Sequence, residues 1–308
     1  MPELPEVQTT VNGINKYAKG LVIKDVWTDY KSDFHAGKDN IKNPDYFKKF
    51  RNNIIGAKIK NSSHIGKNVL INLSSGKTIV THMKMTGHFL YGAYEYNTKK
   101  NMWTATNAGP LRDDPFNKWI HFVMIFSNKK SLTLSDMRKF ARVNLEDTKM
   151  LHDSPHLEGH GPDALDPKFT LEKFGKAVAT KPHWPIKKTL MDYTVISGIG
   201  NIYSDEILWR AGIHPLEKVK NIPAAKIRQM YKAMKATLVR GIDFGGDSMS
   251  DYRNVMGKRG KFQEKHEAYR RTGEKCRKPG CRGIIRRIKV GGRSAHFCSV
   301  HQKLSCLS

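Results

Sequence analysis

The cysteines of this chain are confined to its C-terminal end, and their spacing restricts how that end can fold. All four lie between Cys276 and Cys306. Three of them join a histidine in the pattern Cys276-x4-Cys281-x16-Cys298-x2-His301. This pattern has the paired knuckles and the loop length of a small zinc ribbon, in which sulfur and nitrogen ligands surround the ion tetrahedrally. We therefore predict a zinc-finger hairpin with one structural Zn²⁺ bound by Cys276, Cys281, Cys298 and His301.

Two other side chains, Cys306 and His296, are alternatives to His301 as the fourth ligand. Neither forms the short-spaced knuckle that Cys298 forms with His301 two residues later, so His301 is preferred and Cys306 is expected to stay unligated. Cysteines clustered in this way are typical of a metal site rather than a disulfide framework. They indicate a reducing, intracellular compartment, either the nucleus or the cytoplasm.

The chain carries a large excess of positive charge. Its 308 residues include 54 Lys and Arg against 28 Asp and Glu, which gives a formal charge of +26 and a pI of about 9.9. Such an excess indicates a polyanionic partner, of which nucleic acid is the commonest. No apolar run approaches the ~18 residues that span a membrane, and the N-terminus lacks a signal-peptide pattern. We expect a nucleic-acid-binding monomer that is neither inserted in a membrane nor secreted.

The N-terminal half has the pattern of an α+β domain. Apolar residues three and four positions apart predict a helix over residues 5–17. Short segments rich in Val and Ile follow, separated by turns, and predict an antiparallel β-sandwich or barrel. These segments are residues 21–27, 57–60, 68–73, 78–83, 119–126 and 131–134. Residues 1–145 are therefore predicted as one domain, with an irregular loop over residues 91–115.

The second half is predicted to be mainly helical. Residues 146–166 are polar and rich in proline and histidine, which is typical of a linker. In the domain that follows, over residues 167–262, a tight glycine turn precedes Asn201, a favourable helix N-cap, as in helix-turn-helix units. The predicted helices also include residues 169–178, 185–191 and 223–239. The glycine-bracketed residues 245–262 are expected to be mobile, and residues 263–308 form the zinc finger.

The N-terminus offers an unusual nucleophile. Removal of the initiator Met, which a small second residue usually permits, leaves Pro2 with a secondary amine. An α-amino group has a pKa near ~8 against ~10.4 for a lysine, so a much larger fraction is neutral at pH 7. Attack of such an amine on an aldehyde-like carbon gives an iminium, and Glu3 is placed to transfer protons. The alternative is structural, because prolines such as Pro5 suit the first turn of a helix.

Three loops of the N-terminal half carry further candidate residues. Lys67 lies in a predicted hairpin turn, where a solvated lysine is the ordinary interpretation. Met85 and Phe140 lie on two other loops, and Phe140 follows the cation Arg138. Apolar side chains at loop tips suit wedges that enter a base stack, and the alternative is that they pack in the core.

Seven motifs occur in one order along nearly the whole chain. They are Pro2-Glu3-Leu4-Pro5-Glu6-Val7, Gly66-Lys67, Thr81-His82-Met83-Lys84-Met85-Thr86-Gly87, Asp136-Met137-Arg138-Lys139-Phe140, Gly161-Pro162-Asp163-Ala164-Leu165, Gly198-Ile199-Gly200-Asn201-Ile202-Tyr203-Ser204-Asp205-Glu206, and the zinc finger with Arg293. In these motifs the chain resembles the formamidopyrimidine-DNA glycosylase / endonuclease VIII family of bifunctional base-excision repair enzymes. The Leu4-Pro5 pair resembles the formamidopyrimidine branch.

The resemblance implies a DNA glycosylase with AP-lyase activity that flips and removes oxidised bases from damaged DNA, duplex or single-stranded. Pro2 would attack the sugar C1′ and expel the base, while Glu3 would donate and accept protons. Lys67 would assist at a phosphate and in the β,δ-elimination that cleaves the strand.

The resemblance also implies how the DNA would be held. Met85, Arg138 and Phe140 would fill the gap left by the flipped nucleotide, with Arg138 facing the orphaned base. Asn201, at the turn of a helix-two-turn-helix, and Arg293, in the zinc finger, would hold phosphates beside the lesion. Such contacts offset the few kcal/mol, roughly, that extrusion of a base from the duplex costs.

The zinc finger departs from the family's usual pattern of two Cys-x2-Cys knuckles. Its first knuckle is widened to Cys276-x4-Cys281 and its second ends in His301, so a tilt of the hairpin would change the aim of Arg293. The alternative function is a non-catalytic zinc-finger protein that binds damaged DNA. The intact Pro2, Glu3 and Lys67 argue against it, because plain binding requires none of them. The sequence leaves open whether oxidised purines or pyrimidines are preferred, and which opposite base.

Overall fold

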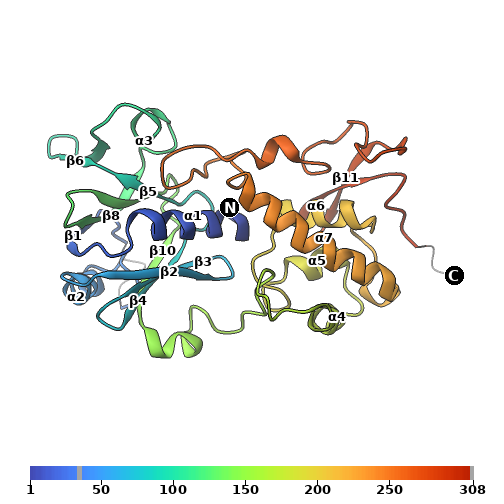
Figure 1. Cartoon of the computed structure of the whole chain (residues 1–308), viewed down its shortest axis with the longest axis horizontal. Coiled ribbons are helices and arrows are strands. Elements are labelled where there is room, and N and C mark those ends of the chain that lie inside the picture. Colours follow the sequence, from blue (N-terminus) through green and yellow to red (C-terminus); the bar gives the residue numbers. More distant parts are fainter. Residues whose placement is uncertain (33–36, 306–308) are drawn as a thin grey trace. The chain divides into compact units, whose positions relative to one another are not determined.

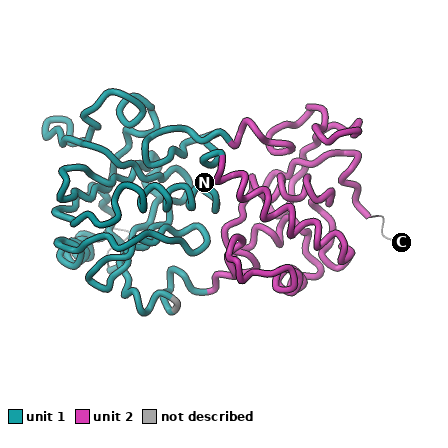
Figure 2. The backbone as a smooth tube through the Cα atoms, viewed as in Figure 1, with its two compact units in different colours: residues 1–158, 244–261 teal, residues 159–243, 262–308 magenta. Residues whose placement is uncertain are grey.

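The computed structural model describes residues 1–32 and 37–305. The chain divides into two compact units (Figure 2). Unit 1 comprises residues 1–158 and 244–261, and unit 2 comprises residues 159–243 and 262–308. Residues 244–261 belong to unit 1, whereas the prediction placed them in the helix-two-turn-helix domain.

Unit 1 contains two four-stranded antiparallel sheets (Figure 1). The first sheet has the order β1 (Ile23–Thr28), β8 (Ile120–Phe126), β9 (Ser131–Ser135) and β5 (His88–Gly92). The second has the order β10 (Arg142–Asp147), β4 (Lys77–His82), β3 (Asn68–Leu73) and β2 (Ile59–Ile65). Phe122 and Leu132 of the first sheet share one buried core with Ile71 and Val143 of the second. This core confirms the predicted antiparallel sandwich.

Helix α1 (Leu4–Tyr17) covers part of this core. It begins with a reciprocal capping box, in which the Glu3 carboxylate accepts from the Glu6 amide and the Glu6 carboxylate accepts from the Glu3 amide. Its apolar residues, among them Val7 and Val11, are buried in the core of the sandwich. The start of the helix is therefore held rigidly.

Several elements of unit 1 were missed from the sequence. Residues 91–115, predicted as an irregular loop, contain the hairpin β6 (Tyr94–Asn97) and β7 (Met102–Ala105) and the short helix α3 (Pro110–Asp113). The hairpin is held by aromatic packing, because Tyr96 and Trp103 face each other in register with ring centroids 5.3 Å apart. The predicted linker is also partly ordered, since it contains the 3₁₀ helix Thr148–Asp153.

Helix α2 (Pro44–Ile54) was missed as well, although its start carries a local signal. Asn43 caps it by accepting from the Asp45 amide at 3.1 Å, and Pro44 occupies the first turn.

Residues 244–261, which the prediction placed in the second domain and expected to be mobile, pack on α1. The Tyr252 hydroxyl donates to the backbone carbonyl of Glu6 at 3.0 Å. Val255 is buried against Gly13, where an added Cβ would lie 2.4 Å from a Val255 methyl. The contact therefore depends on a glycine in the middle of α1, far away in sequence.

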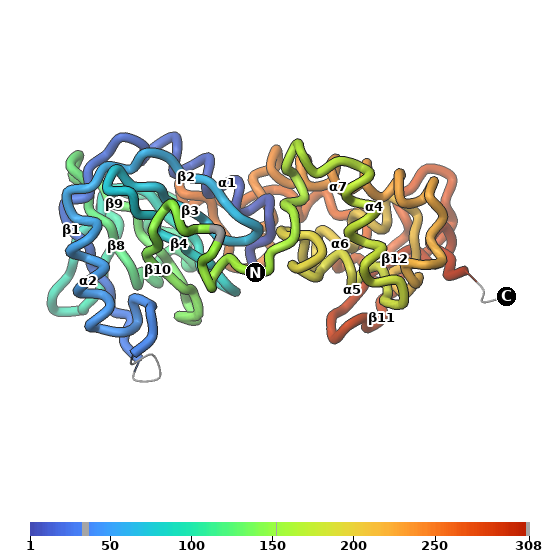
Figure 3. Tube along the Cα trace, turned by 90° about the horizontal axis from the view of Figure 1, so that it is seen from below, coloured from blue at the N-terminus to red at the C-terminus, as the bar shows by residue number. Residues whose placement is uncertain are grey.

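Unit 2 is mainly helical (Figures 1 and 3). Its helices are α4 (Leu171–Ala179), α5 (Ile186–Met191), α6 (Asn201–Ala211) and α7 (Ala224–Asp243). The hairpin β11 (Ile285–Val290) and β12 (Arg293–Cys298) turns through Gly291 and Gly292, whose φ angles of 56° and 77° require glycine-like freedom. No helix within residues 1–32 and 37–305 is both long and apolar enough to cross a membrane.

Candidate functional site

The predicted nucleophile and proton-transfer group lie together at the start of α1. Pro2 is buried, whereas Met1 in front of it is 43 % exposed. Glu3 is buried as the N-cap of the helix. An amine freed at Pro2 would lie at this helix start, directly before Glu3. Schiff-base chemistry requires such an amine in its neutral, nucleophilic form.

Glu6 is a third group at this helix start, and its role was missed from the sequence. Its buried carboxyl accepts from the amides of Glu3 and Asp247, each at 2.7 Å. Burial, followed by the charge of Glu3, raises the pKa of Glu6 to about 8 and outweighs the two amide donors. The acidic residue three positions after Glu3 was the available signal, because that spacing is typical of a capping box.

We expect the protein to lose stability as Glu6 ionises. The folded protein binds this proton more tightly than the unfolded chain does. The contribution is complete below the unfolded pKa of 4.5 and is lost as the pH rises through about 8. Glu6→Gln keeps an acceptor oxygen and removes the titration. By calorimetry, the melting temperature of the wild type relative to Glu6→Gln should fall by several degrees between about pH 6 and about pH 9.

Glu172→Gln is the matched control. Glu172 is exposed, and the hydrogen bond from Lys176 at 2.7 Å lowers its pKa, so it stays ionised over the same range. The melting difference between wild type and Glu172→Gln should not change with pH. A similarly constant difference for Glu6→Gln would contradict the role given to burial.

Lys67 lies in the turn between β2 and β3 and is half-buried. Strand β2 is tied to α1 by two contacts: Asn15 hydrogen-bonds the Ser62 backbone, and Gln8 contacts the His64 ring at 2.8 Å. From Ser62 to His64, in the direction of the turn, the contacted residue of α1 changes from Asn15 to Gln8, which is nearer the helix start. The turn with Lys67 therefore extends toward the end of α1 that carries the predicted nucleophile.

The predicted wedge residues are exposed on two loops of unit 1. Met85 lies between β4 and β5 and is 39 % exposed, and Phe140 lies between β9 and β10 and is 47 % exposed. The core alternative for these two side chains is therefore excluded. The Arg138 guanidinium lies 4.4 Å from the centroid of the Phe140 ring, so the cation and the aromatic ring form one surface.

Asp136 holds these two loops together and was overlooked as a functional residue. Its fully buried carboxylate accepts from the Tyr30 hydroxyl at 3.1 Å and the Ala141 amide at 2.7 Å. It also accepts from the Thr86 hydroxyl, which in turn accepts from the Arg138 amide at 3.1 Å. The buried Asp136 side chain thus fixes both loops that carry predicted wedge residues. In the sequence, the only signal for this role was the position of Asp136 directly after an apolar strand.

In unit 2, Asn201 begins α6, but the residue at the N-cap is Gly200. This corrects the prediction that Asn201 caps the helix. The Asn201 side-chain oxygen is buried and has no hydrogen-bond partner among the described residues. A polar atom in that state costs free energy unless a ligand or water satisfies it. The backbone amides of the helix start are donors and suit a phosphate, whereas this side-chain oxygen is an acceptor and requires a hydrogen-bond donor.

A buried ionic network fixes the start of α6 to the zinc-finger hairpin. The Lys187 ammonium of α5 contacts the Asp205 carboxylate at 2.5 Å and the Asn201 carbonyl at 3.2 Å. The other oxygen of Asp205 accepts from the backbone amide of His296 at 2.9 Å and contacts its ring at 2.9 Å. Because His296 belongs to β12, which begins at Arg293, the network positions both predicted phosphate contacts. Sequence patterns gave no indication of it.

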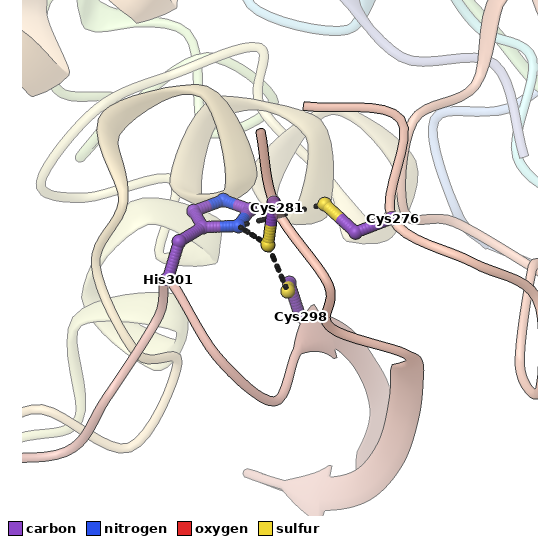
Figure 4. Close-up of side chains that lie close together, drawn as sticks. All are labelled: Cys276, Cys281, Cys298 and His301. Atoms are coloured by element: carbon purple, nitrogen blue, oxygen red, sulfur yellow. Dashed lines mark hydrogen bonds between the residues drawn. The ribbon is translucent and has the colours of Figure 1, made fainter. Parts of the chain in front are cut away.

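The four predicted metal ligands converge (Figure 4). Their ligand atoms all lie within 4.8 Å of one another. The Cys281 and Cys298 sulfurs are 3.5 Å apart, and His301 Nδ1 is 3.5 Å from the Cys276 sulfur. A tetrahedral zinc with bonds of about 2.3 Å to sulfur and 2.0 Å to nitrogen requires separations of about 3.8 Å and 3.6 Å. The residues present therefore fit zinc.

The surroundings of the cluster favour ligation as well. His301 Nε2 lies 3.0 Å from the carbonyl of Trp209, which places the proton on Nε2 and leaves the Nδ1 lone pair facing the sulfurs. Burial lowers the pKa of His301, so the neutral, ligating form dominates. His296, an alternative ligand, contacts Asp205 instead and is not in the cluster. Cys306, the other alternative, lies outside the described residues.

Comparison with known proteins identifies the family. The model of the formamidopyrimidine-DNA glycosylase N-terminal domain matches residues 1–143, and that of its H2TH domain matches residues 160–253. The formamidopyrimidine-DNA glycosylase of Desulforamulus reducens is 32 % identical over 98 % of this chain and 99 % of the relative. That of Pelotomaculum thermopropionicum is 33 % identical over 99 % and 100 %.

Solved structures agree. The complex of Lactococcus lactis Fpg with DNA that contains an abasic site aligns with a TM-score of 0.80 at 27 % identity, over 98 % of this chain and 99 % of that one. The complex of wild-type Lactococcus lactis Fpg with N7-benzyl-Fapy-dG-containing DNA aligns with a TM-score of 0.79 at 27 % identity, over 98 % and 100 %. The chain therefore belongs to the formamidopyrimidine-DNA glycosylase family of base-excision repair enzymes.

Proposed function

We propose that this protein removes oxidised bases from DNA through a Schiff base on Pro2 and then cleaves the strand as an AP lyase. The observation that supports this most is the pairing of Pro2 and Glu3 at a helix start that is anchored in the core of unit 1. Plain DNA binding requires neither residue. The hairpin turn with Lys67 runs toward the same end of α1.

The chemistry follows from the amine. The Pro2 nitrogen forms a bond to C1′ while the bond from C1′ to the base breaks, and the base leaves with a proton. Ring opening gives an iminium, with Glu3 supplying the proton to the ring oxygen. The iminium acidifies C2′, whose proton is lost as the 3′ phosphate departs, and a second elimination releases the 5′ phosphate. Lys67 would stabilise the charge of the departing phosphate.

Borohydride reduction in the presence of abasic-site DNA tests this proposal. The reductant converts the iminium to a stable amine. A covalent protein–DNA adduct is therefore expected for wild type that begins at Pro2, and gel electrophoresis measures it. Glu3→Gln should form the adduct but should excise oxidised bases at least about a hundred-fold more slowly, because only proton transfer is lost. Absence of an adduct with wild type would instead favour the non-catalytic DNA-binding protein.

We further propose that Met85, Arg138 and Phe140 fill the space left by the flipped nucleotide, whereas Asn201 and Arg293 hold phosphates. Phosphate contacts release counterions, so Arg293→Gln should reduce the salt slope of DNA binding by about one unit. Phe140→Ala removes no charge and should leave this slope unchanged. It should slow excision from duplex more than from single strands, where the base is already unstacked. Fluorescence anisotropy and single-turnover excision measure the two effects.

The opposite pattern would refute the wedge assignment. If Phe140→Ala changed the salt slope and left duplex excision unaffected, the ring would have no role in base extrusion. Phe116→Ala is a less exposed aromatic control in unit 1 whose ring contacts the Arg253 guanidinium at 4.7 Å. Its effect on excision should be equal for duplex and single-stranded substrates.

We also propose that one structural Zn²⁺ is held by Cys276, Cys281, Cys298 and His301. The ion would stabilise the fold of the zinc finger by linking its two knuckles and would take no part in catalysis. Cysteines that ligate zinc are reduced thiolates, and we therefore propose a reducing compartment. A monomer remains our expectation.

A further inference from the structure

A cluster of positively charged side chains lies in unit 2 at the C-terminal end of α6, whereas Asn201 lies at the N-terminal end of this helix. A groove of about 470 Å³ is formed there by the last turn of α6, part of α7 and the zinc finger. We call it the α6–α7 groove. Because α6 has 11 residues, with a rise of about 1.5 Å each, the groove lies about 15 Å along the helix from Asn201. It is therefore separate from the phosphate contact proposed at the start of α6.

The lining of the α6–α7 groove is strongly cationic. Its polar residues are Arg210, Lys226, Gln229, Lys232 and Lys278, and no acidic residue is among its lining. None of the four cations forms an ion pair with a residue that the structure describes. The Lys226 ammonium donates to the Ala211 carbonyl at 3.2 Å, and the other three cations are exposed. Like charges gathered without counter-charges repel one another, so an anion entering the groove lowers its free energy.

Lys278 reaches the groove from the widened knuckle of the zinc finger. The Cys276–Cys281 knuckle has four intervening residues, whereas the knuckle that ends in His301 has two. The Lys278 amide donates to the Cys276 sulfur at 3.4 Å, and its carbonyl accepts from the Cys281 amide at 3.0 Å. The knuckle therefore fixes the backbone of Lys278, and the additional residues supply a cation that faces α6 and α7.

The other lining residues indicate what kind of anion fits. The apolar lining consists of three alanines, Ala211, Ala233 and Ala236. A protein partner would require aromatic or large aliphatic anchors at the centre of the interface, and the groove provides none. Small side chains between cations instead leave room for a backbone of repeated phosphates. Lysine, arginine and glutamine side chains contact the phosphates of such a backbone, and these contacts do not depend on the base sequence.

We propose that the α6–α7 groove binds the phosphate backbone of a nucleic acid as a second, sequence-independent contact. The proposal rests on the proposed function only in taking DNA as the polyanion. It predicts a contact that is independent of the lesion and strongly dependent on salt, because each neutralised phosphate releases counterions.

The test is the double variant Lys232→Gln/Lys278→Gln in the full-length chain, with lesion-free duplex DNA as the probe. Both side chains are exposed, so the melting temperature should stay at the wild-type value. The slope of log Kd against log salt concentration should fall by about two units, and by about one unit for each single variant. Fluorescence anisotropy over a series of salt concentrations measures this slope.

The matched control is Lys99→Gln/Lys100→Gln, which removes the same charge from the exposed turn between β6 and β7. A slope unchanged in the groove variant, or lowered equally in the control, would overturn the proposal. So would an unchanged slope with lost affinity for a polyglutamate peptide, which would assign the groove to an acidic protein. Borohydride trapping of the wild type tests the proposed function separately. If no adduct formed but the groove variant had a lowered salt slope, the proposed function would be refuted and the phosphate contact in the α6–α7 groove would stand.

Discussion

Retention of any residue in front of Pro2 is expected to reduce lesion excision and strand cleavage by at least about a thousand-fold. An acylated proline nitrogen shares its lone pair with the carbonyl, so it cannot attack C1′. DNA binding should be normal, because the wedge loops, the start of α6 and the zinc-finger hairpin do not involve the terminal amine. Single-turnover excision and equilibrium binding, measured on the same oxidised-base duplex, separate the two properties.

A cleavable N-terminal extension provides the control within one preparation. Activity should be absent before protease treatment and should appear once mass spectrometry shows Pro2 as the first residue. The same extension at the C-terminus should leave excision unchanged. Full cleavage activity in a protein with a verified N-terminal extension would rule out Pro2 as the nucleophile.

Loss of the fourth ligand in His301→Ala is expected to unfold the zinc finger and weaken DNA binding severely. A structural zinc contributes on the order of 10 kcal/mol to the ordering of a small domain, which the hairpin β11–β12 has no large core to replace. The variant should lose its equivalent of zinc in metal analysis. Backbone amides of β11 and β12 should lose protection from hydrogen exchange, while those of the unit 1 sandwich should keep it.

His301→Cys and Cys306→Ser are the paired controls. His301→Cys supplies a sulfur at the same position and should retain zinc and DNA binding. Cys306→Ser should change neither, because the cluster is complete without that thiol. Full zinc content in His301→Ala, or its loss in Cys306→Ser, would show that the ligand set is different.

Much of the fold was predictable because it is encoded locally. Helix α1 follows from an apolar periodicity of 3.6, and strand β3 follows from a short apolar run rich in Val, Leu and Ile; both signals depend only on neighbours in the chain. The metal cluster is nearly as local, since two short knuckles bring their own ligands together. The hairpin β6–β7 escaped prediction in part because Trp27 of β1 packs on its Tyr96 and Trp103 rings, and this distant residue reaches them only in the folded chain.

The sequence by itself determined the family motifs, the helix start that carries Pro2 and Glu3, and the cluster of three cysteines and one histidine that could hold a metal ion. Each of these depends on residues a few positions apart. Only the tertiary structure decided that residues 244–261 cover α1 and bury Glu6, which raises the pKa of its carboxyl. Only the tertiary structure, likewise, brought Lys278 beside α6 and α7. Burial and charge environment depend on which distant segments pack together, and no local pattern specifies that.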